Sequence, residues 1–352
     1  MRPVALRSIP IVIALIVLSC GGTPAAIVAS PTAAPTTAAT TAASAAPATA
    51  AQPIKVRAAY QNITPANLAP YFAKDQGIFL KHGLDVDLPL IDGGAKVMAA
   101  LLGNSIDIAQ VGGTEIMNAS ASGADVEAVA LFVPVSPWVL MAPASYTGPA
   151  DLKGKSVGVA SRGGSAEIAA VQCIDKLGLK VTDITILATG STANLTAAML
   201  AGQVYAGPGH PPDTSALFKA GFKVIVDLAA QKVPAVENTT VTSKKFASAN
   251  KDVVQRYVDS LIDAIAVMKK DKATTLAVMK KLLSLTDDAA ASQTYDFYVT
   301  SIFPIYPEVT PPAWTYSRDE LAKTSPQVKD LDVTKVIDNS FVADAQKRKV
   351  GG

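Results

Sequence analysis

Four short segments of this chain combine glycine with hydroxyl, amide or carboxylate side chains where an expected strand ends and an expected helix begins. They are Gln61-Asn62, Asp92-Gly93-Gly94, Gly112-Gly113-Thr114 and Ser161-Arg162-Gly163-Gly164-Ser165. Glycine lets the backbone approach a ligand closely, and helix N-termini present free N–H groups with partial positive charge. The four segments therefore predict a binding site for a small polar or anionic molecule.

The charged and aromatic side chains near these segments leave two kinds of ligand open. Arg162 could pair with a sulfonate or carboxylate. Glu115 and Glu167 fall in first helical turns, where the helix dipole accounts for a carboxylate, but facing a cleft they would favour a ligand nitrogen. Trp138 could stack on a ligand, and His210 lies on an expected loop at the cleft mouth. We expect a compact anion, with a nitrogen heterocycle as the alternative.

Few residues are available for catalysis. The histidines are His82 and His210, and no phosphate-binding loop or dinucleotide fingerprint has the required spacing. Of the two cysteines, Cys173 lies in an apolar helical pattern typical of a small buried side chain. The sequence therefore predicts a binding protein with no catalytic residue, metal or cofactor. A pyrimidine-synthase-like enzyme and a surface interaction lipoprotein without a small ligand remain further alternatives.

The N-terminus predicts export and a lipid anchor. Arg2 and Arg7 precede an apolar run that is too short to span a bilayer and ends at Ser19-Cys20. Residues 1–19 are therefore expected to be a signal peptide, and Cys20 the site of lipidation. Residues 20–53 consist mainly of Ala, Thr, Pro and Ser without charge, which indicates a disordered tether to the membrane. The net charge of +2 includes both arginines, and no basic stripe suggests a nucleic-acid partner.

The remaining residues alternate between strand and helix patterns, which predicts the α/β class with mostly parallel sheets. Expected strands include Ile54–Tyr60, Leu84–Leu88, Ile106–Ala109 and Val126–Val133, and residues beyond 243 are expected to be helical. A unit near residues 83–106 is echoed near residues 178–204. Two related lobes are therefore predicted, with a cleft at the carboxyl ends of their strands.

An ordered set of sequence pieces resembles one family. The pieces span Tyr71–Val86, Val97–Ala109, Asp151–Val159 and Ala220–Val224. Together they are similar to the substrate-binding proteins of bacterial ABC importers for nitrate, sulfonates, taurine and thiamine-precursor pyrimidines. One departure is Tyr205, at a position where this family usually has an aspartate, as the first lobe does at Asp107.

The resemblance implies a two-lobed periplasmic-binding-protein-like fold of type II that closes on a small solute and delivers it to a membrane permease. Lobe one is expected to comprise residues 54–138 and 240–352, and lobe two residues 139–239. Chain crossings near Val133–Trp138 and Glu237–Val241 would form the hinge. We expect a monomer. The expected ligand contacts are Gln61, Asn62, Asp92, Gly93, Gly94, Gly113, Thr114, Trp138, Ser161, Arg162, Gly163, Gly164, Ser165 and His210.

Overall fold

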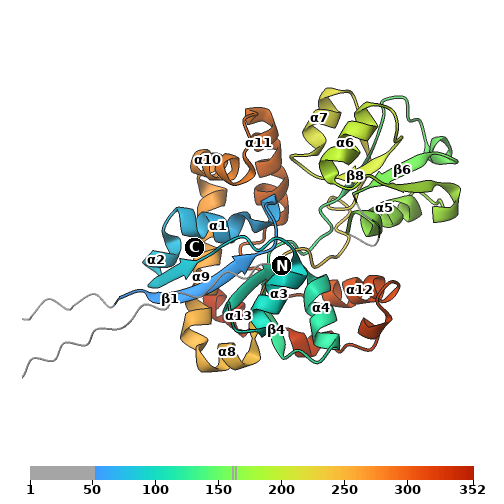
Figure 1. Ribbon diagram of the computed structural model, residues 1–352. Helices are drawn as coiled ribbons and strands as arrows, with labels where there is room; N and C mark the ends of the chain where they lie inside the picture. Colours follow the sequence, from blue (N-terminus) through green and yellow to red (C-terminus); the bar gives the residue numbers. More distant parts are fainter. Residues whose placement is uncertain (1–51, 161, 163–164) are drawn as a thin grey trace, which may run out of the picture. The chain divides into compact units, whose positions relative to one another are not determined.

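The computed structural model describes residues 52–160, 162 and 165–352. The predicted signal peptide, Cys20, all but the end of the predicted tether, and Ser161, Gly163 and Gly164 lie outside the described residues. The described part alternates strands and helices around separate groups of strands, which confirms the α/β class (Figure 1). Within it, every helix is too short or too polar to cross a membrane.

The larger group of strands is a five-stranded sheet with the order β2-β1-β3-β10-β4. β1 is parallel to β2 and β3, whereas β10 runs antiparallel to β3 and β4. We call this sheet and its helices the large lobe. Its strands are β1 (Ile54–Tyr60), β2 (Leu84–Asp87), β3 (Ile108–Val111), β4 (Val126–Leu131) and β10 (Thr239–Ser243).

The helices of the large lobe come from both ends of the chain, blue to teal-green and gold to red in Figure 1. The long helix α9 is amphipathic and supplies the buried Tyr257, whose ring stacks on Phe79 at 4.8 Å. The helices are α1 (Leu68–Asp75), α2 (Ile78–Lys81), α3 (Gly94–Leu102), α4 (Gly113–Ala121), α8 (Lys244–Ala249), α9 (Lys251–Lys270), α10 (Lys272–Leu283), α11 (Asp288–Tyr295), α12 (Pro311–Ala322) and α13 (Ser340–Lys347). A π-helical segment, Asp296–Ile302, follows α11.

The second group of strands and its helices form the small lobe. It holds an antiparallel sheet with the order β8-β5-β9 and a parallel pair, β6-β7. The strands of this lobe are therefore mixed, and the three-stranded sheet is antiparallel because β5 runs opposite to both of its neighbours, β8 and β9. The elements are β5 (Val139–Ala142), β6 (Ser156–Val159), α5 (Ser165–Lys176), β7 (Thr185–Ala188), α6 (Thr192–Leu200), β8 (Gly207–Gly209), α7 (Thr214–Lys219) and β9 (Lys223–Asp227).

Two chain crossings join the lobes and run side by side. The first links β4 to β5 and the second links β9 to β10. They are paired by an antiparallel bridge between Val135 and Pro234 and by a 2.8 Å hydrogen bond from Ser136 N to Val233 O. The second crossing includes Glu237 and ends at Asn238, because residues from Thr239 already pair with β3 and β4.

The Tyr205 departure changes the local contacts of the echoed unit. In the large lobe, Asp107 accepts hydrogen bonds from the Arg57 backbone N–H at 3.0 Å and Nε at 3.1 Å. In the small lobe, the Tyr205 backbone N–H donates to Ser156 Oγ at 3.3 Å, and Lys155 Nζ lies 5.8 Å from the centroid of the Tyr205 ring. A backbone-to-hydroxyl bond therefore stands where the large lobe has its carboxylate.

Candidate functional site

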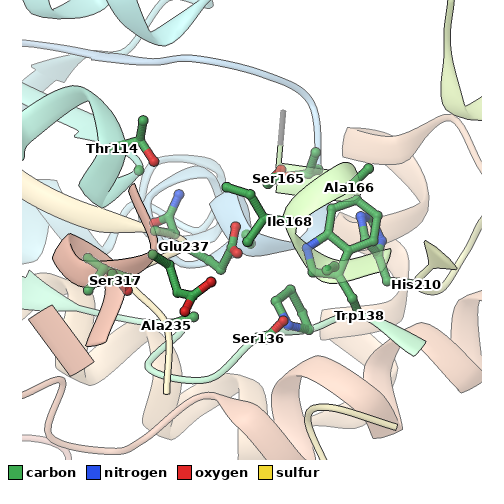
Figure 2. A pocket seen from close by; sticks show the side chains of 18 of the residues that line it. Thr114, Ser136, Trp138, Ser165, Ala166, Ile168, His210, Ala235, Glu237 and Ser317 are labelled. Carbon is green, nitrogen blue, oxygen red and sulfur yellow. The ribbon is translucent and has the colours of Figure 1, made fainter. Parts of the chain in front are cut away.

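A cavity of about 510 Å³ is lined by both lobes, by both chain crossings and by the C-terminal helices. Its walls combine the starts of α4 and α5 with side chains from the crossings. Figure 2 shows Trp138 and His210 side by side at this cavity, together with Glu237 and Ser165. The site is thus assembled from segments that are far apart in the sequence.

Six of the expected contact residues line the cavity. They come from three of the four loop segments, from the first crossing and from the end of β8. Their presence agrees with the prediction that strand ends and helix starts converge, while contact with a ligand itself stays a prediction. The six are Gln61, Asn62, Thr114, Trp138, Ser165 and His210.

Four expected contacts, Asp92, Gly93, Gly94 and Gly113, do not line the cavity. A Cβ atom at Gly94 would lie 2.2 Å from Gln61 Oε1 and 2.6 Å from Glu115 Oε1. A Cβ at Gly113 would lie 2.6 Å from Cβ of Val236. These two glycines therefore make room for lining residues to pack against the backbone, rather than room for a ligand.

Arg162 also does not line the cavity. Its side chain is exposed and its Nη2 lies 3.1 Å from Glu167 Oε1. The partner is close in sequence, in the first turn of α5, so Arg162 forms a local ion pair outside the cavity lining. Glu167 likewise is not a lining residue.

Glu115 does line the cavity, and it also caps α4. Its carboxyl accepts hydrogen bonds from its own backbone N–H and from that of Gly112, and both bonds lower its pKa. Burial outweighs them and raises the pKa above its usual value. The helix dipole is therefore only part of the role of this side chain, because the same carboxyl borders the cavity.

Glu237, on the second crossing, was not among the expected contacts. Burial first, and the charge of Glu115 second, raise the pKa of its carboxyl to about 7, and the nearby Trp138 indole N–H opposes the rise. The Trp138 Nε1 atom itself has no partner at hydrogen-bond geometry. Two carboxyls that influence each other thus face one cavity.

A chain of amide side chains leaves an unpaired acceptor at the cavity wall. Asn67 Nδ2 donates to the backbone oxygen of Asn62 at 2.9 Å, which fixes the orientation of the Asn67 amide. The Asn67 Oδ1 atom must then accept, and it does so from Asn238 Nδ2 at 2.8 Å. Asn238 Oδ1 is left buried without a donor among the described residues, as is Gln61 Oε1. Both residues line the cavity.

Aromatic rings form one side of the cavity. The Trp138 and His210 ring centroids are 4.8 Å apart, and those of His210 and Tyr298 are 6.1 Å apart. Tyr298 lies in the π-helical segment, a type of irregularity that is frequent at functional sites. Flat rings beside acceptors suit a planar ligand that carries N–H groups.

The charged side chains among the described lining residues are all carboxylic: Glu115, Glu237 and Glu320. Glu320 is paired with Lys323, whose Nζ lies 2.6 Å away. Cys173, in contrast, is buried in the small-lobe core, and burial raises the pKa of its thiol to about 12. The predicted buried role of Cys173 is confirmed, and the thiol there is not poised as a thiolate nucleophile.

Comparisons with known proteins agree with this architecture. A family model described as NMT1/THI5 like matches residues 64–274. The riboflavin-binding protein RibY of Chloroflexus aurantiacus is 25% identical over 275 residues, which cover 76% of this chain and 74% of that protein.

Solved structures share the fold at lower identity. The periplasmic aliphatic sulphonate binding protein SsuA from Escherichia coli matches with a TM-score of 0.69 and 22% identity, covering 81% of this chain and 98% of that one. The desulfurization enzyme DszB matches with a TM-score of 0.62 and 14% identity, covering 84% and 99%. The chain therefore has a periplasmic-binding-protein fold, which SsuA uses for binding and DszB for catalysis.

Proposed function

The chain belongs to the NMT1/THI5-like family, and on that premise we propose that it is the solute-binding component of an ABC importer whose cavity takes a nitrogen heterocycle. A membrane permease would be its partner, and the lipid predicted at Cys20 would hold it at the outer face of the cytoplasmic membrane. This proposal departs from the compact anion that the sequence favoured.

The carboxyl groups in the cavity favour a ligand with hydrogen-bond donors over an anion. Glu115 and Glu237 face the cavity, whereas Arg162, the cation expected to meet an anion, is paired outside it. An anion would be repelled by these carboxylates when they are ionised. A heterocycle with ring N–H or amino groups would instead donate to them and to unpaired acceptors such as Asn238 Oδ1.

The size of the cavity supports the same ligand class. Its volume of about 510 Å³ lies within the range of pockets that enclose drug-sized molecules, roughly 300–1,000 Å³. Nitrate or taurine would leave much of that space to water. A flavin or a substituted pyrimidine would fill more of it and could stack on Trp138.

A thermal-shift screen tests the proposal. We expect riboflavin or the thiamine-precursor pyrimidine to raise the melting temperature of the purified protein, because a ligand that binds the native state stabilises it by mass action. Nitrate, taurine and ethanesulfonate serve as matched anionic probes and should produce no shift. Stabilisation by an anion, without stabilisation by either heterocycle, would reject the heterocycle in favour of the original expectation.

A further inference from the structure

Helix α12 supplies one wall of the cavity, although it lies outside the residues that the family model matches. The match ends at residue 274, whereas α12 spans Pro311–Ala322. Four residues of α12 line the cavity: Tyr316, Ser317, Glu320 and Leu321. Ser317 is labelled in Figure 2 beside the residues of the crossings. Part of the binding surface is therefore built from a segment that the family comparison does not describe.

This helix belongs to the large lobe through its buried face. Trp314 is fully buried in a hydrophobic cluster with residues of α3 and α4, and Ala313 and Leu321 belong to the same cluster. Pro311 and Pro312 occupy the first positions of the helix, where a missing backbone N–H costs nothing. The helix is thus held firmly at the edge of the large lobe.

Tyr316, two residues beyond Trp314, reaches in the other direction. Its ring packs against the core cluster of the small lobe, and its hydroxyl accepts a 3.2 Å hydrogen bond from Nε2 of Gln172 on α5. Both side chains line the cavity. The pair therefore bridges the two lobes at the wall of the binding site itself.

Besides the His210–Tyr298 ring contact at the cavity, two polar interlobe contacts lie away from it. Ser215 Oγ donates to Gln293 Oε1 at 2.9 Å, and Lys219 pairs with Asp287. None of these four residues lines the cavity. These contacts can hold the lobes together, but their side chains cannot touch a ligand in the cavity. The Tyr316–Gln172 bridge can hold the lobes together and also touch a ligand, because its two side chains form part of the cavity wall.

We propose that Tyr316 is a specificity-determining residue that, through its hydrogen bond to Gln172, closes the cavity over ligands short enough to fit behind it. The proposal rests on the proposed solute-binding function. The bridge requires the two lobes to be together, so a ligand that fits strengthens the closed arrangement and is retained by it. A ligand that projects past α12 would keep Tyr316 and Gln172 apart.

Dissociation rates test the role of Tyr316 in retention. The probes are riboflavin and the thiamine-precursor pyrimidine, measured by stopped flow with the full protein. Tyr316→Phe keeps the ring and loses the hydrogen bond, so we expect a roughly threefold to tenfold faster off-rate with little change in on-rate. Tyr306→Phe is the matched control, since that ring packs against the large-lobe core and does not line the cavity.

Two further measurements test whether Tyr316 acts through its hydrogen bond to Gln172 or only through the packing of its ring. Gln172→Met should match Tyr316→Phe, and the double variant should be no worse than either single variant, because both changes remove one shared bond. Small-angle scattering of the ligand-free protein should show a larger radius of gyration in Tyr316→Phe than in Tyr306→Phe.

Unchanged off-rates, additive effects of the two substitutions, or an unchanged radius would each overturn the bridge. Scattering needs no ligand, so failure of both probes to bind would count against the proposed function alone. The bridge would then be judged by the radius of gyration.

Discussion

Replacing Glu237 by glutamine should stabilise the ligand-free protein at about pH 8 by about 3 kcal/mol, the free energy that corresponds to a shift of roughly two and a half pKa units. Burial first, and the charge of Glu115 second, raise the pKa of Glu237 from 4.5 to about 7. Glutamine has nearly the same shape and cannot ionise. The variant therefore avoids the cost of burying a charge near Glu115.

The pH dependence has a definite sign. Below about pH 4.5 the Glu237 carboxyl is protonated in both the folded and the unfolded state, so it does not lower the free energy of unfolding. Between 4.5 and about 7 only the unfolded state ionises, so wild-type stability falls as pH rises. Above about pH 7 the folded state also ionises, and the full cost of burying the charged Glu237 carboxylate lowers the free energy of unfolding. Glu237→Gln should remove this slope and converge with wild type near pH 4.

Melting temperatures of the two proteins at the two ends of this window provide the measurement. Glu320→Gln is the control, because Glu320 lines the same cavity but is paired with Lys323 near the surface. Its change should stay within about 1 kcal/mol at either pH. Equal melting temperatures of wild type and Glu237→Gln at about pH 8 would contradict a buried carboxyl that is costly to ionise.

Replacing Trp314 by alanine should destabilise the protein by about 3–5 kcal/mol, the range for deleting a fully buried large aromatic side chain. Trp314 belongs to the buried cluster that joins α12 to α4, so the wall that carries Tyr316 should loosen as well. We expect a lower denaturant midpoint and weaker binding of whichever heterocycle the screen identifies.

Two matched variants qualify this result. Thr315→Ala changes the exposed neighbour on the same helix and should leave the denaturant midpoint nearly unchanged. Trp314→Phe should cost less than alanine, because most ring contacts remain and Trp314 Nε1 has no hydrogen-bond partner among the described residues to lose. A loss below about 1 kcal/mol in Trp314→Ala would show that α12 is not anchored by this side chain.

Local sequence signals predicted the parts of the site that lie at helix starts. Thr114 and Ser165 come directly at such starts, and Gln61 follows β1. Glycine, hydroxyl and amide residues are typical of turns and helix starts, so these places can be recognised from segments of only a few residues. The α/β class and the large-lobe strands follow from patterns of the same short range.

The sequence did not indicate the lining residues that reach the cavity through contacts between segments far apart in the chain. Glu237 reaches the cavity only because two crossings pair side by side, and Tyr316 only because α12 folds back onto α4. A clue was the polar pair Glu237-Asn238, which directly follows the apolar residues Val233-Pro-Ala-Val236. Nothing in the sequence indicated that the Arg162 guanidinium would pair with Glu167, five residues further along the chain.

The central claim is that this cavity favours donor groups over anions, and the affinity ratio between wild type and Glu237→Gln tests it most directly. Calorimetry at about pH 8, where the carboxyl is ionised, should show riboflavin or the thiamine-precursor pyrimidine binding at least about tenfold more weakly to the variant, as expected for a lost bond to a charged group. Ethanesulfonate should bind neither protein. Ethanesulfonate binding to wild type that tightens in Glu237→Gln would contradict the account, because only an anionic ligand gains when this charge is removed.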